Sequence, residues 1–309
     1  MANHDVVCPL CGQSAFNRMA LPHTTVWKCN SGKCGLEFAH PQLAPDALAS
    51  AYSNLYYPGH EAEKGPEFGN TPKTTLQDFF GQLEKRIGSL RGLRLLDYGC
   101  GRGALLEVAK EFGMQVCGIE SDPQARMAAG AIPDASIYSN VDDLQRAEPN
   151  AQFDLVILWT VIEHLRIPWA ELAQLRTLLQ PGGWLLISTM DIHCLRARVE
   201  RGKWENYENP THLYYFDRTS LAHAIREAGF VDFSEWRLKL TYPQHGALRR
   251  WLYDLCFAMR ISDGLFFLCR QGNEVWERVP NLNRETLGIP QGSGQHSAVT
   301  PRSELKTRS

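Results

Sequence analysis

Apolar and polar residues follow two different periods along the chain, and the alternation of these periods marks one large region. Between residues 92 and 271, apolar runs of strand length are separated by segments whose apolar residues recur at helical spacing. The strand-like runs are LRLLDYG, QVCGIES, ASIYS, FDLVILW, WLLIST, VDFSEWRLK and GLFFLCR. Strands that alternate with helices favour a parallel sheet with helices on both faces. The pattern predicts an α/β fold with a seven-stranded, mostly parallel sheet.

The segments on either side of this region have other patterns. Residues 1–40 lack helical periodicity and are rich in Cys, Gly and Pro, which indicates a small separate unit. Residues 41–91 hold a short helix, an aromatic stretch rich in Gly and Pro that we interpret as a linker or lid, and an amphipathic helix. Residues 272–309 are polar and rich in Ser, Gly and Pro, so we expect a flexible tail.

Composition limits the classes of protein to consider. The chain has 309 residues, 44% of them hydrophobic, and a net charge of −2, so a large core can form and a dedicated nucleic-acid binder is not indicated. The start of the sequence has no signal-peptide pattern, and no stretch of about 18 apolar residues predicts a transmembrane helix. We therefore expect a cytoplasmic protein, and the sequence leaves its oligomeric state open.

The strongest chemical signal is the segment LLDYGCGRGALLEVA. Its strand ends near Asp97 and turns into a helix through a glycine loop, which lets a ligand approach the backbone. The loop residues that we assign to cofactor binding are Gly99, Cys100, Gly101 and Gly103. Such a loop alone also fits an ordinary turn or a dinucleotide site. However, Asp97 suits a ligand ammonium group, and Glu120, about twenty residues further on, can accept two ribose hydroxyls. The set favours a nucleoside with a cationic tail over NAD.

Four motifs in this order carry a family resemblance: LLDYGCGRG, GIESDP, FDLVILWTVIEHL and LLQPGGWLLIST. Over about residues 92–271 the chain resembles a class I S-adenosylmethionine-dependent methyltransferase. The resemblance implies a Rossmann-like fold, with S-adenosylmethionine as methyl donor, the glycine loop around its methionine part and Glu120 on its ribose. The positions that match the adenine region are Asn140, Val141 and Asp142. Residues 142–143 could equally form a helix N-cap pair.

The segment VIEHL follows the fourth predicted strand and should line the same crevice as Trp159, which we also assign to the cofactor site. Glu163 and His164 resemble the pair found in methyltransferases of small molecules, including the ubiquinone-biosynthesis O-methyltransferases. A histidine beside the methyl donor could remove a proton from a hydroxyl acceptor. Alternatively, the pair caps a helix and the reaction proceeds by positioning alone. Thr160 stands where some ubiquinone-type relatives carry another acid, so we do not expect metal-assisted chemistry here.

A long connection follows the fifth predicted strand, at residues 191–221, and long ordered connections tend to be functional. Its segment NPTHL is similar to acceptor-site segments of the same methyltransferase group. His212 is therefore a candidate general base or substrate contact. The alternative is that the aromatic residues of this connection merely pack it onto the domain.

Two cysteine pairs near the start of the chain predict a metal site. Cys8 and Cys11 form one pair, and Cys29 and Cys34 lie near the tip of a predicted hairpin, VWKCNSGKCGLEF. Two such pairs can place four thiolates tetrahedrally around Zn²⁺ in a closed, structural site. The sequence thus predicts a zinc ribbon in residues 1–40, and the alternative is four reduced, unbound cysteines.

The front ribbon and the aromatic stretch with Tyr56 and Tyr57 resemble bacterial methyltransferases of polysaccharide and nucleotide-sugar pathways. These tyrosines could close over the cofactor or simply pack. The first hypothesis is therefore methyl transfer to a small-molecule or glycan-pathway acceptor, most favourably a hydroxyl. A second is an RNA base methyltransferase that uses the ribbon as an RNA clamp, which the lack of basic charge disfavours. A third is a non-catalytic binding protein, which the intact glycine loop disfavours.

The segment RRWLYDLCFAM predicts a helix with two arginines beside a broad apolar face. Such a helix could touch a membrane or a lipid-linked acceptor. We expect instead that it packs this face on its own domain, as amphipathic helices of globular proteins do.

Overall fold

The computed structural model describes residues 6–56, 71–240, 242 and 245–272. Its main sheet has seven strands in the order β10-β11-β8-β7-β4-β5-β6. In chain order these strands are β4 (Arg94–Tyr98), β5 (Gln115–Ile119), β6 (Ser136–Tyr138), β7 (Phe153–Trp159), β8 (Leu179–Met190), β10 (Asp232–Glu235) and β11 (Gly264–Arg270). The strands from β8 to β6 are parallel, and β11 runs antiparallel to its neighbours β8 and β10. The predicted seven-stranded, mostly parallel sheet is confirmed.

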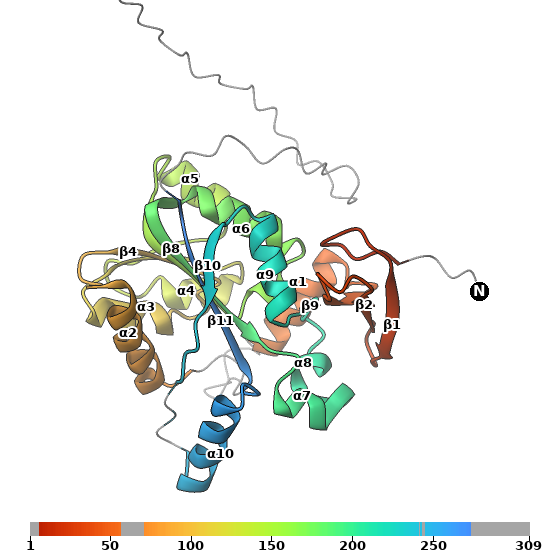
Figure 1. Cartoon of the computed structure of the whole chain (residues 1–309). Helices are drawn as coiled ribbons and strands as arrows, with labels where there is room; N and C mark the ends of the chain where they lie inside the picture. The colour runs from red at the N-terminus through yellow and green to blue at the C-terminus, as the bar shows by residue number, and fades with distance from the viewer. Residues whose placement is uncertain (1–5, 57–70, 241, 243–244, 273–309) are drawn as a thin grey trace, which may run out of the picture. The chain divides into compact units, whose positions relative to one another are not determined.

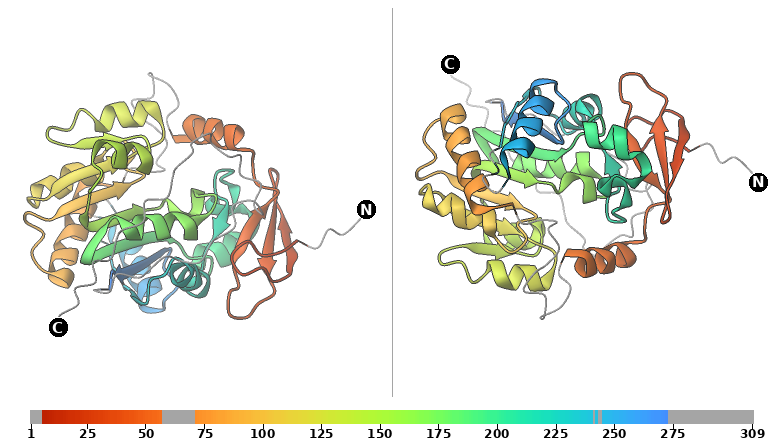
Figure 2. Two further views of the ribbon diagram at one scale, coloured as in Figure 1. Left: turned by 90° about the horizontal axis from the view of Figure 1, so that it is seen from above. Right: turned by 90° about the horizontal axis from the view of Figure 1, so that it is seen from below.

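Helices cover both faces of this sheet, as Figures 1 and 2 show. Alternate residues of β7 belong to two different cores: Leu155 packs with one face and Val156 with the other. The helices that contribute to the Leu155 face are α2 (Lys73–Ile87), α3 (Ala104–Glu111) and α4 (Pro123–Ala129). Those on the Val156 face are α5 (Val141–Ala147), α6 (Pro168–Thr177) and α9 (Arg218–Glu227). The two cores hold the sheet rigidly between them.

A second, smaller sheet combines strands of the N-terminal region with one strand of the α/β region. Its strands are β1 (Ala15–Ala20), β2 (Thr25–Cys29), β3 (Glu37–His40) and β9 (Tyr214–Tyr215). The predicted hairpin is confirmed as β2 and β3, whereas β1 and β9 were not predicted. Because β9 belongs to the long connection after β8, the N-terminal sheet is completed by a strand from the α/β region. We call residues 6–40 the ribbon.

The long connection folds into short helices before it reaches β9. They are α7 (Leu195–Glu200), the 3₁₀ turn η2 (Arg201–Lys203) and α8 (Glu205–Glu208). Trp204 is buried and packs edge-on against Tyr207, whose ring in turn packs against Tyr215. These aromatic residues share a core with Val26 and Ala39 of the ribbon. The aromatic residues of the connection thus pack against the ribbon, whereas the alternative considered from the sequence was packing onto the α/β domain.

Three further elements follow the ribbon, β7 and β10. The helix α1 (Pro45–Tyr56) follows the ribbon, the 3₁₀ turn η1 (Ile162–His164) follows β7, and α10 (Ala247–Ala258) lies between β10 and β11. None of the helices in the described ranges is long and apolar enough to cross a membrane. Tyr57 and the predicted tail beyond Gly272 lie outside the described residues.

The strand β8 begins earlier than the predicted strand-like run WLLIST. The helix α6 ends at Thr177, and β8 already begins at Leu179, before the Pro-Gly-Gly segment. Leu179 pairs with Phe153, and the register with β7 shifts before Trp184, so Pro-Gly-Gly lies in an irregularity of the strand. Gly183 is needed there, since a Cβ at this position would lie 2.9 Å from the Gln180 carbonyl oxygen. The glycines allow the strand to bulge rather than mark the end of the helix.

Candidate active site

The glycine loop connects β4 to α3 in the conformation that its sequence predicts. Gly99, Gly101 and Gly103 have φ angles of 81°, 55° and 88°, which favour glycine. A Cβ on Gly99 would lie 2.5 Å from Val161, and one on Gly103 would lie 2.4 Å from Ile132. The loop is therefore packed closely against the segment after β7, which places it beside the VIEHL residues.

Two buried carboxyl groups flank this loop at the ends of neighbouring strands. The Glu120 carboxylate accepts hydrogen bonds from the backbone N–H groups of Gly101 and Asp122, both at 2.8 Å. Burial and the neighbouring Glu120 raise the pKa of Asp97 to about 8, and burial also raises the pKa of Glu120. Because the two groups disfavour each other's charge, a bound cation or hydroxyl donor would stabilise this site.

The helix α1 touches both the loop after β5 and the long connection. The Ser53 hydroxyl donates a 2.6 Å hydrogen bond to Asp122, whose other oxygen caps α4. The Tyr56 hydroxyl accepts a 2.8 Å hydrogen bond from the Asn209 side chain. These two residues lie three positions apart on one helix, so α1 bridges the glycine-loop side and the NPTHL side of the site.

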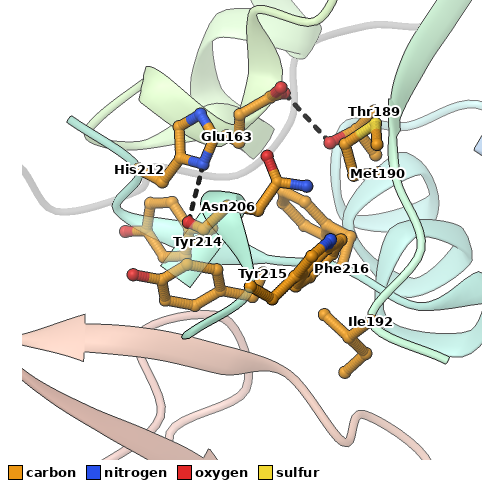
Figure 3. Close-up of a pocket in the computed structure, with 10 residues that line it drawn as sticks. Glu163, Thr189, Met190, Ile192, Asn206, His212, Tyr214, Tyr215 and Phe216 are labelled. Carbon is orange, nitrogen blue, oxygen red and sulfur yellow. Dashed lines mark hydrogen bonds between the residues drawn. The ribbon is translucent and has the colours of Figure 1, made fainter. Parts of the chain in front are cut away.

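A second group of chemically active side chains lies at η1 and the long connection. A carboxylate oxygen of Glu163 and one ring nitrogen each of His164 and His212 lie within 4.8 Å of one another. The Glu163 carboxylate is buried and accepts a 3.0 Å hydrogen bond from the Thr189 hydroxyl, as Figure 3 shows. Burial raises the pKa of Glu163 to about 7, which is near the pH at which a general base is most effective.

The hydrogen bonds of the two histidines define their tautomers. His164 places Nδ1 3.1 Å from the Thr211 carbonyl oxygen, and His212 places Nδ1 2.9 Å from the Asn206 carbonyl oxygen. A carbonyl accepts only, so each Nδ1 carries the proton and each Nε2 is the basic atom. The His212 Nε2 already accepts a 3.2 Å hydrogen bond from Asn209. Of the two rings, His164 thus has the basic nitrogen better placed for a ligand.

Both histidines are weaker bases than their type suggests. Burial lowers the pKa of His164 to about 4 and the pKa of His212 well below its ordinary 6.5. Glu163 is the member of the cluster whose pKa suits proton transfer near neutral pH.

Aromatic rings surround His164. Tyr52 and Tyr56 approach it edge-on with ring centroids at 5.5 and 5.8 Å, and His212 lies at 4.7 Å. Sequence reasoning named Tyr56 but missed Tyr52 and Asn209 as parts of the site. The signal that could have found Asn209 is its place in NPTHL, whereas Tyr52 carries no signal because its neighbour His164 is far away in the sequence.

A small cavity lies behind the cluster, with Glu163 and His212 in its wall (Figure 3). Its volume of about 10 Å³ matches a single water molecule. Three buried polar atoms, on Trp204, Asn206 and Tyr215, have no hydrogen-bond partner among the residues that the structure describes, and all three residues line this cavity. The cavity is thus polar enough for one ordered water, and it is too small for an acceptor.

The four cysteines of the ribbon are brought together as the sequence predicts. All four sulfur atoms lie within 4.8 Å of one another, with Cys8 and Cys34 at 3.8 Å and Cys11 and Cys29 at 3.4 Å. Four thiolates that bind Zn²⁺ at about 2.3 Å in a tetrahedron lie about 3.8 Å apart. The donor set and its spacing fit a structural zinc ion.

The remaining predicted cofactor residues occupy less distinctive places. Asn140 is the N-cap of α5 and accepts a 2.8 Å hydrogen bond from the Asp143 N–H, so Asn140 and not Asp142 caps this helix. Val141 is buried and Asp142 is exposed. Trp159 packs edge-on against Phe79 of α2 at 4.8 Å. Contacts of these residues with adenine or with the methyl donor stay predictions.

The fold, together with the glycine loop and its acidic partners, is that of a class I S-adenosylmethionine-dependent methyltransferase. A family model described as a methyltransferase domain matches residues 70–235, more than half of the chain, and the protein belongs to this family.

Curated relatives include two ubiquinone biosynthesis O-methyltransferases. The protein from Bradyrhizobium sp. (strain ORS 278) is 35% identical over 117 residues, which are 36% of this chain and 46% of that protein. The protein from Ruegeria pomeroyi is 30% identical over 178 residues, 49% of this chain and 69% of that protein. The chain thus spans about half of the first relative and just over two thirds of the second.

Similar solved structures include an S-adenosylmethionine-dependent methyltransferase from Mesorhizobium loti. It has a TM-score of 0.48 and 17% identity, and it covers 62% of this chain and 97% of its own. A phosphoethanolamine N-methyltransferase from Haemonchus contortus has a TM-score of 0.47 and 19% identity, and it covers 75% of this chain and 58% of its own.

Proposed function

We propose that the protein transfers a methyl group from S-adenosylmethionine to a hydroxyl oxygen of a small-molecule acceptor. One observation carries this proposal: the glycine loop packs directly against the segment that bears Glu163, since Gly99 leaves no room for a Cβ beside Val161. The cofactor loop and a base of suitable pKa therefore belong to one site. Family membership and the names of the curated relatives support the same reaction.

The residues around the loop suit the three parts of S-adenosylmethionine. The ammonium group would sit near Asp97, the ribose hydroxyls would donate to Glu120, and the adenine would lie near the start of α5. When bound, this molecule supplies an activated methyl group on a sulfonium. The chain contributes the buried carboxyl groups that favour its positive charge.

Methyl transfer requires that the acceptor oxygen lose its proton as it attacks the methyl carbon and the carbon–sulfur bond breaks. We assign the uptake of this proton to the cluster of Glu163, His164 and His212. Glu163 is its base, because the pKa near 7 keeps a substantial fraction ionised at neutral pH. His164, with its basic Nε2 and low pKa, is better suited to accept a hydrogen bond and orient the hydroxyl.

The aromatic surroundings of the cluster favour one class of acceptor. A hydroxylated aromatic ring fits the tyrosines and histidine that surround the cluster. A nucleotide-sugar or other glycan-pathway acceptor is the alternative that the front ribbon suggested. The small-molecule relatives support either of these over an RNA base.

We further propose that the four ribbon cysteines bind one structural Zn²⁺. The ion would lock the turns that precede β1 and β3 and would leave no open coordination position for a substrate. Elemental analysis of the purified protein should give about one zinc per chain. Loss of zinc after Cys11→Ser, without loss from Cys256→Ser on α10, would assign it to this cluster.

The first experiment is calorimetric titration of the full chain with S-adenosylmethionine and S-adenosylhomocysteine. Wild type and Glu107→Ala, an exposed change on α3, should bind at micromolar concentration, and Glu120→Ala should bind at least about tenfold more weakly. Acceptors are then screened by transfer of an isotope-labelled methyl group, phenols and catechols before nucleotide sugars. A folded wild type that binds neither compound would exclude the proposal.

A further inference from the structure

The helix α10 turns its apolar stripe to solvent, against the expectation that it would pack on its own domain. No residue of this helix is buried. The exposed members of the stripe are Leu248 (71% exposed), Trp251 (59%), Leu252 (46%), Leu255 (41%) and Met259, just after the helix (60%). Their spacing of three, four and seven positions places them on one face.

The opposite face of α10 holds the helix to the body. The Arg237 guanidinium lies 5.0 Å over the Phe257 ring, and Tyr253 packs edge-on against Tyr242 at 5.8 Å. Lys239 pairs with Asp254 at 2.7 Å. Because these contacts come from the segment after β10, the helix is fixed with its apolar stripe outward, the reverse of an ordinary surface helix.

The charge beside the stripe is basic. Arg249 and Arg250 are exposed and form no ion pair within the part of the chain that the structure describes; by helical spacing Arg249 flanks the stripe, whereas Arg250 lies nearly opposite it. The acid within α10, Asp254, is neutralised by Lys239. Leucine and tryptophan on one face with arginine beside them is the composition of helices that lie in the interface of a bilayer. The unpaired arginines favour an anionic surface.

The size and place of the stripe favour a lipid surface over another protein. A helix of 12 residues is about 18 Å long, so a stripe on one side offers roughly 200 Å², well below the about 800 Å² per partner of a stable protein interface. Figure 1 shows α10 projecting from the body beyond the sheet. A projecting row of large apolar side chains can insert into headgroups without a complementary surface.

We propose that α10 docks the protein on anionic lipid bilayers. The helix leads into β11 at Gly264, which pairs with Met190 at the carboxyl end of β8. The glycine loop and η1 follow the carboxyl ends of β4 and β7; β7 pairs in parallel with β8, and β4 pairs in parallel with β7, so α10 emerges at the edge that carries the active site. Resting on the proposed function, docking would present this edge to acceptors that partition into a bilayer.

Flotation of the full chain with vesicles tests the docking. Vesicles of phosphatidylcholine with about 30 mol% phosphatidylglycerol have a negative surface and should bind the wild-type protein. Pure phosphatidylcholine vesicles, or high salt, should weaken the binding. Two double variants, Trp251→Glu with Leu255→Glu and Arg249→Glu with Arg250→Glu, should each lose about tenfold or more in vesicle affinity. The matched control is Val199→Glu with Val231→Glu, which are 71% and 74% exposed and lie outside α10.

Circular dichroism and thermal melts establish that each variant is folded, and none of these measurements depends on methyl transfer. Wild type that does not float with anionic vesicles overturns the proposal, as does equal binding by the α10 variants and the control. Sedimentation velocity tests the alternative that a second copy of the chain covers the stripe. A dimer that the Trp251→Glu, Leu255→Glu variant dissociates, with no vesicle binding, would assign the stripe to a second copy of the chain instead.

Discussion

The two halves of the candidate site are built in different ways. The cofactor half comes from one short stretch, in which Asp97, the glycine loop and Glu120 occupy adjacent strand ends. The acceptor half combines η1, the long connection and α1, and the hydrogen bond between Tyr56 and Asn209 joins residues 153 positions apart. Local geometry therefore defines the cofactor half, whereas long-range packing defines the acceptor half.

The ribbon is part of that long-range packing. The Ala39 N–H donates to the Leu213 carbonyl at 2.9 Å, and the Leu213 N–H donates to the Glu163 carbonyl at 2.8 Å. The Tyr207 hydroxyl donates at 2.8 Å to Glu37, a buried carboxylate of β3. These bonds connect the ribbon to the residues beside Glu163 and His212. Changes in the ribbon should thus affect the acceptor half and spare the cofactor half.

The largest expected effect separates the two halves by chemistry. Glu163→Gln keeps the shape of the side chain and removes the base, so methyl transfer should fall about 10²- to 10⁴-fold while S-adenosylhomocysteine binds as before. In wild type the rate should fall as the pH drops below about 7, because the Glu163 carboxylate becomes protonated. The variant should lack this step in its pH profile. An unchanged rate, or an equal loss in the exposed control Glu107→Gln, would remove Glu163 from the chemistry.

The next effect concerns the cofactor half alone. Burial raises the folded-state pKa of Asp97 from 3.8 to about 8, so between these values the folded protein holds a proton that the unfolded chain releases. Stability of the ligand-free protein therefore falls as the pH rises through this window. Asp97→Asn should remove that loss and raise the unfolding free energy on the order of 5 kcal/mol at pH 8, with little gain near pH 4.

The same substitution should weaken S-adenosylmethionine about tenfold or more, since the ammonium loses a charged partner. Denaturant titrations at several pH values and calorimetry measure the two effects. A variant with weaker binding and no pH-dependent gain in stability would show that burial does not raise the pKa of Asp97.

A smaller effect tests the connection between the ribbon and the acceptor half. Tyr207→Phe leaves the buried Glu37 without one hydrogen bond, which should cost about 1–3 kcal/mol of stability. Asn206 precedes Tyr207 and its carbonyl holds His212, so the KM for the acceptor should rise several-fold while the affinity for S-adenosylhomocysteine is unchanged. Tyr138→Phe is the matched control, because its hydroxyl also donates to a glutamate, Glu148, but far from the ribbon. Equal kinetics for both variants would contradict the connection.

The same contrast explains what could be predicted from the sequence. The seven strands of the main sheet, the glycine loop and the cysteine cluster follow from local periodicity and from spacing, and all of them are present, although β8 begins earlier than expected. The strand β9 was missed because two residues, Tyr214 and Tyr215, carry no period, and their pairing with β3 is a long-range contact.

Burial, in turn, cannot be inferred from residue type. The low pKa of His164 and the outward stripe of α10 both depend on which neighbours pack around a side chain. Periodicity identifies the apolar face of a helix, yet the contacts of the opposite face decide whether that apolar face is covered. The candidate residues of the acceptor half were therefore named from the sequence, and their roles stay predictions. The burial that favours Glu163 over the two histidines as the base required the structure.

The smallest expected effect lies on α1, a helix that touches both halves. Ser53→Ala removes the hydrogen bond to Asp122 beside Glu120, and a bond of this kind contributes about 0.5–1.5 kcal/mol, so S-adenosylhomocysteine should bind about two- to tenfold more weakly. Tyr56→Phe, one helical turn away, removes the bond to Asn209 and should change the KM for the acceptor instead. Thr177→Ala, which removes a hydroxyl hydrogen bond at the end of α6, is the control. If both α1 variants changed both constants together, α1 would act as one rigid clamp, and the division of the site into two halves would end at this helix.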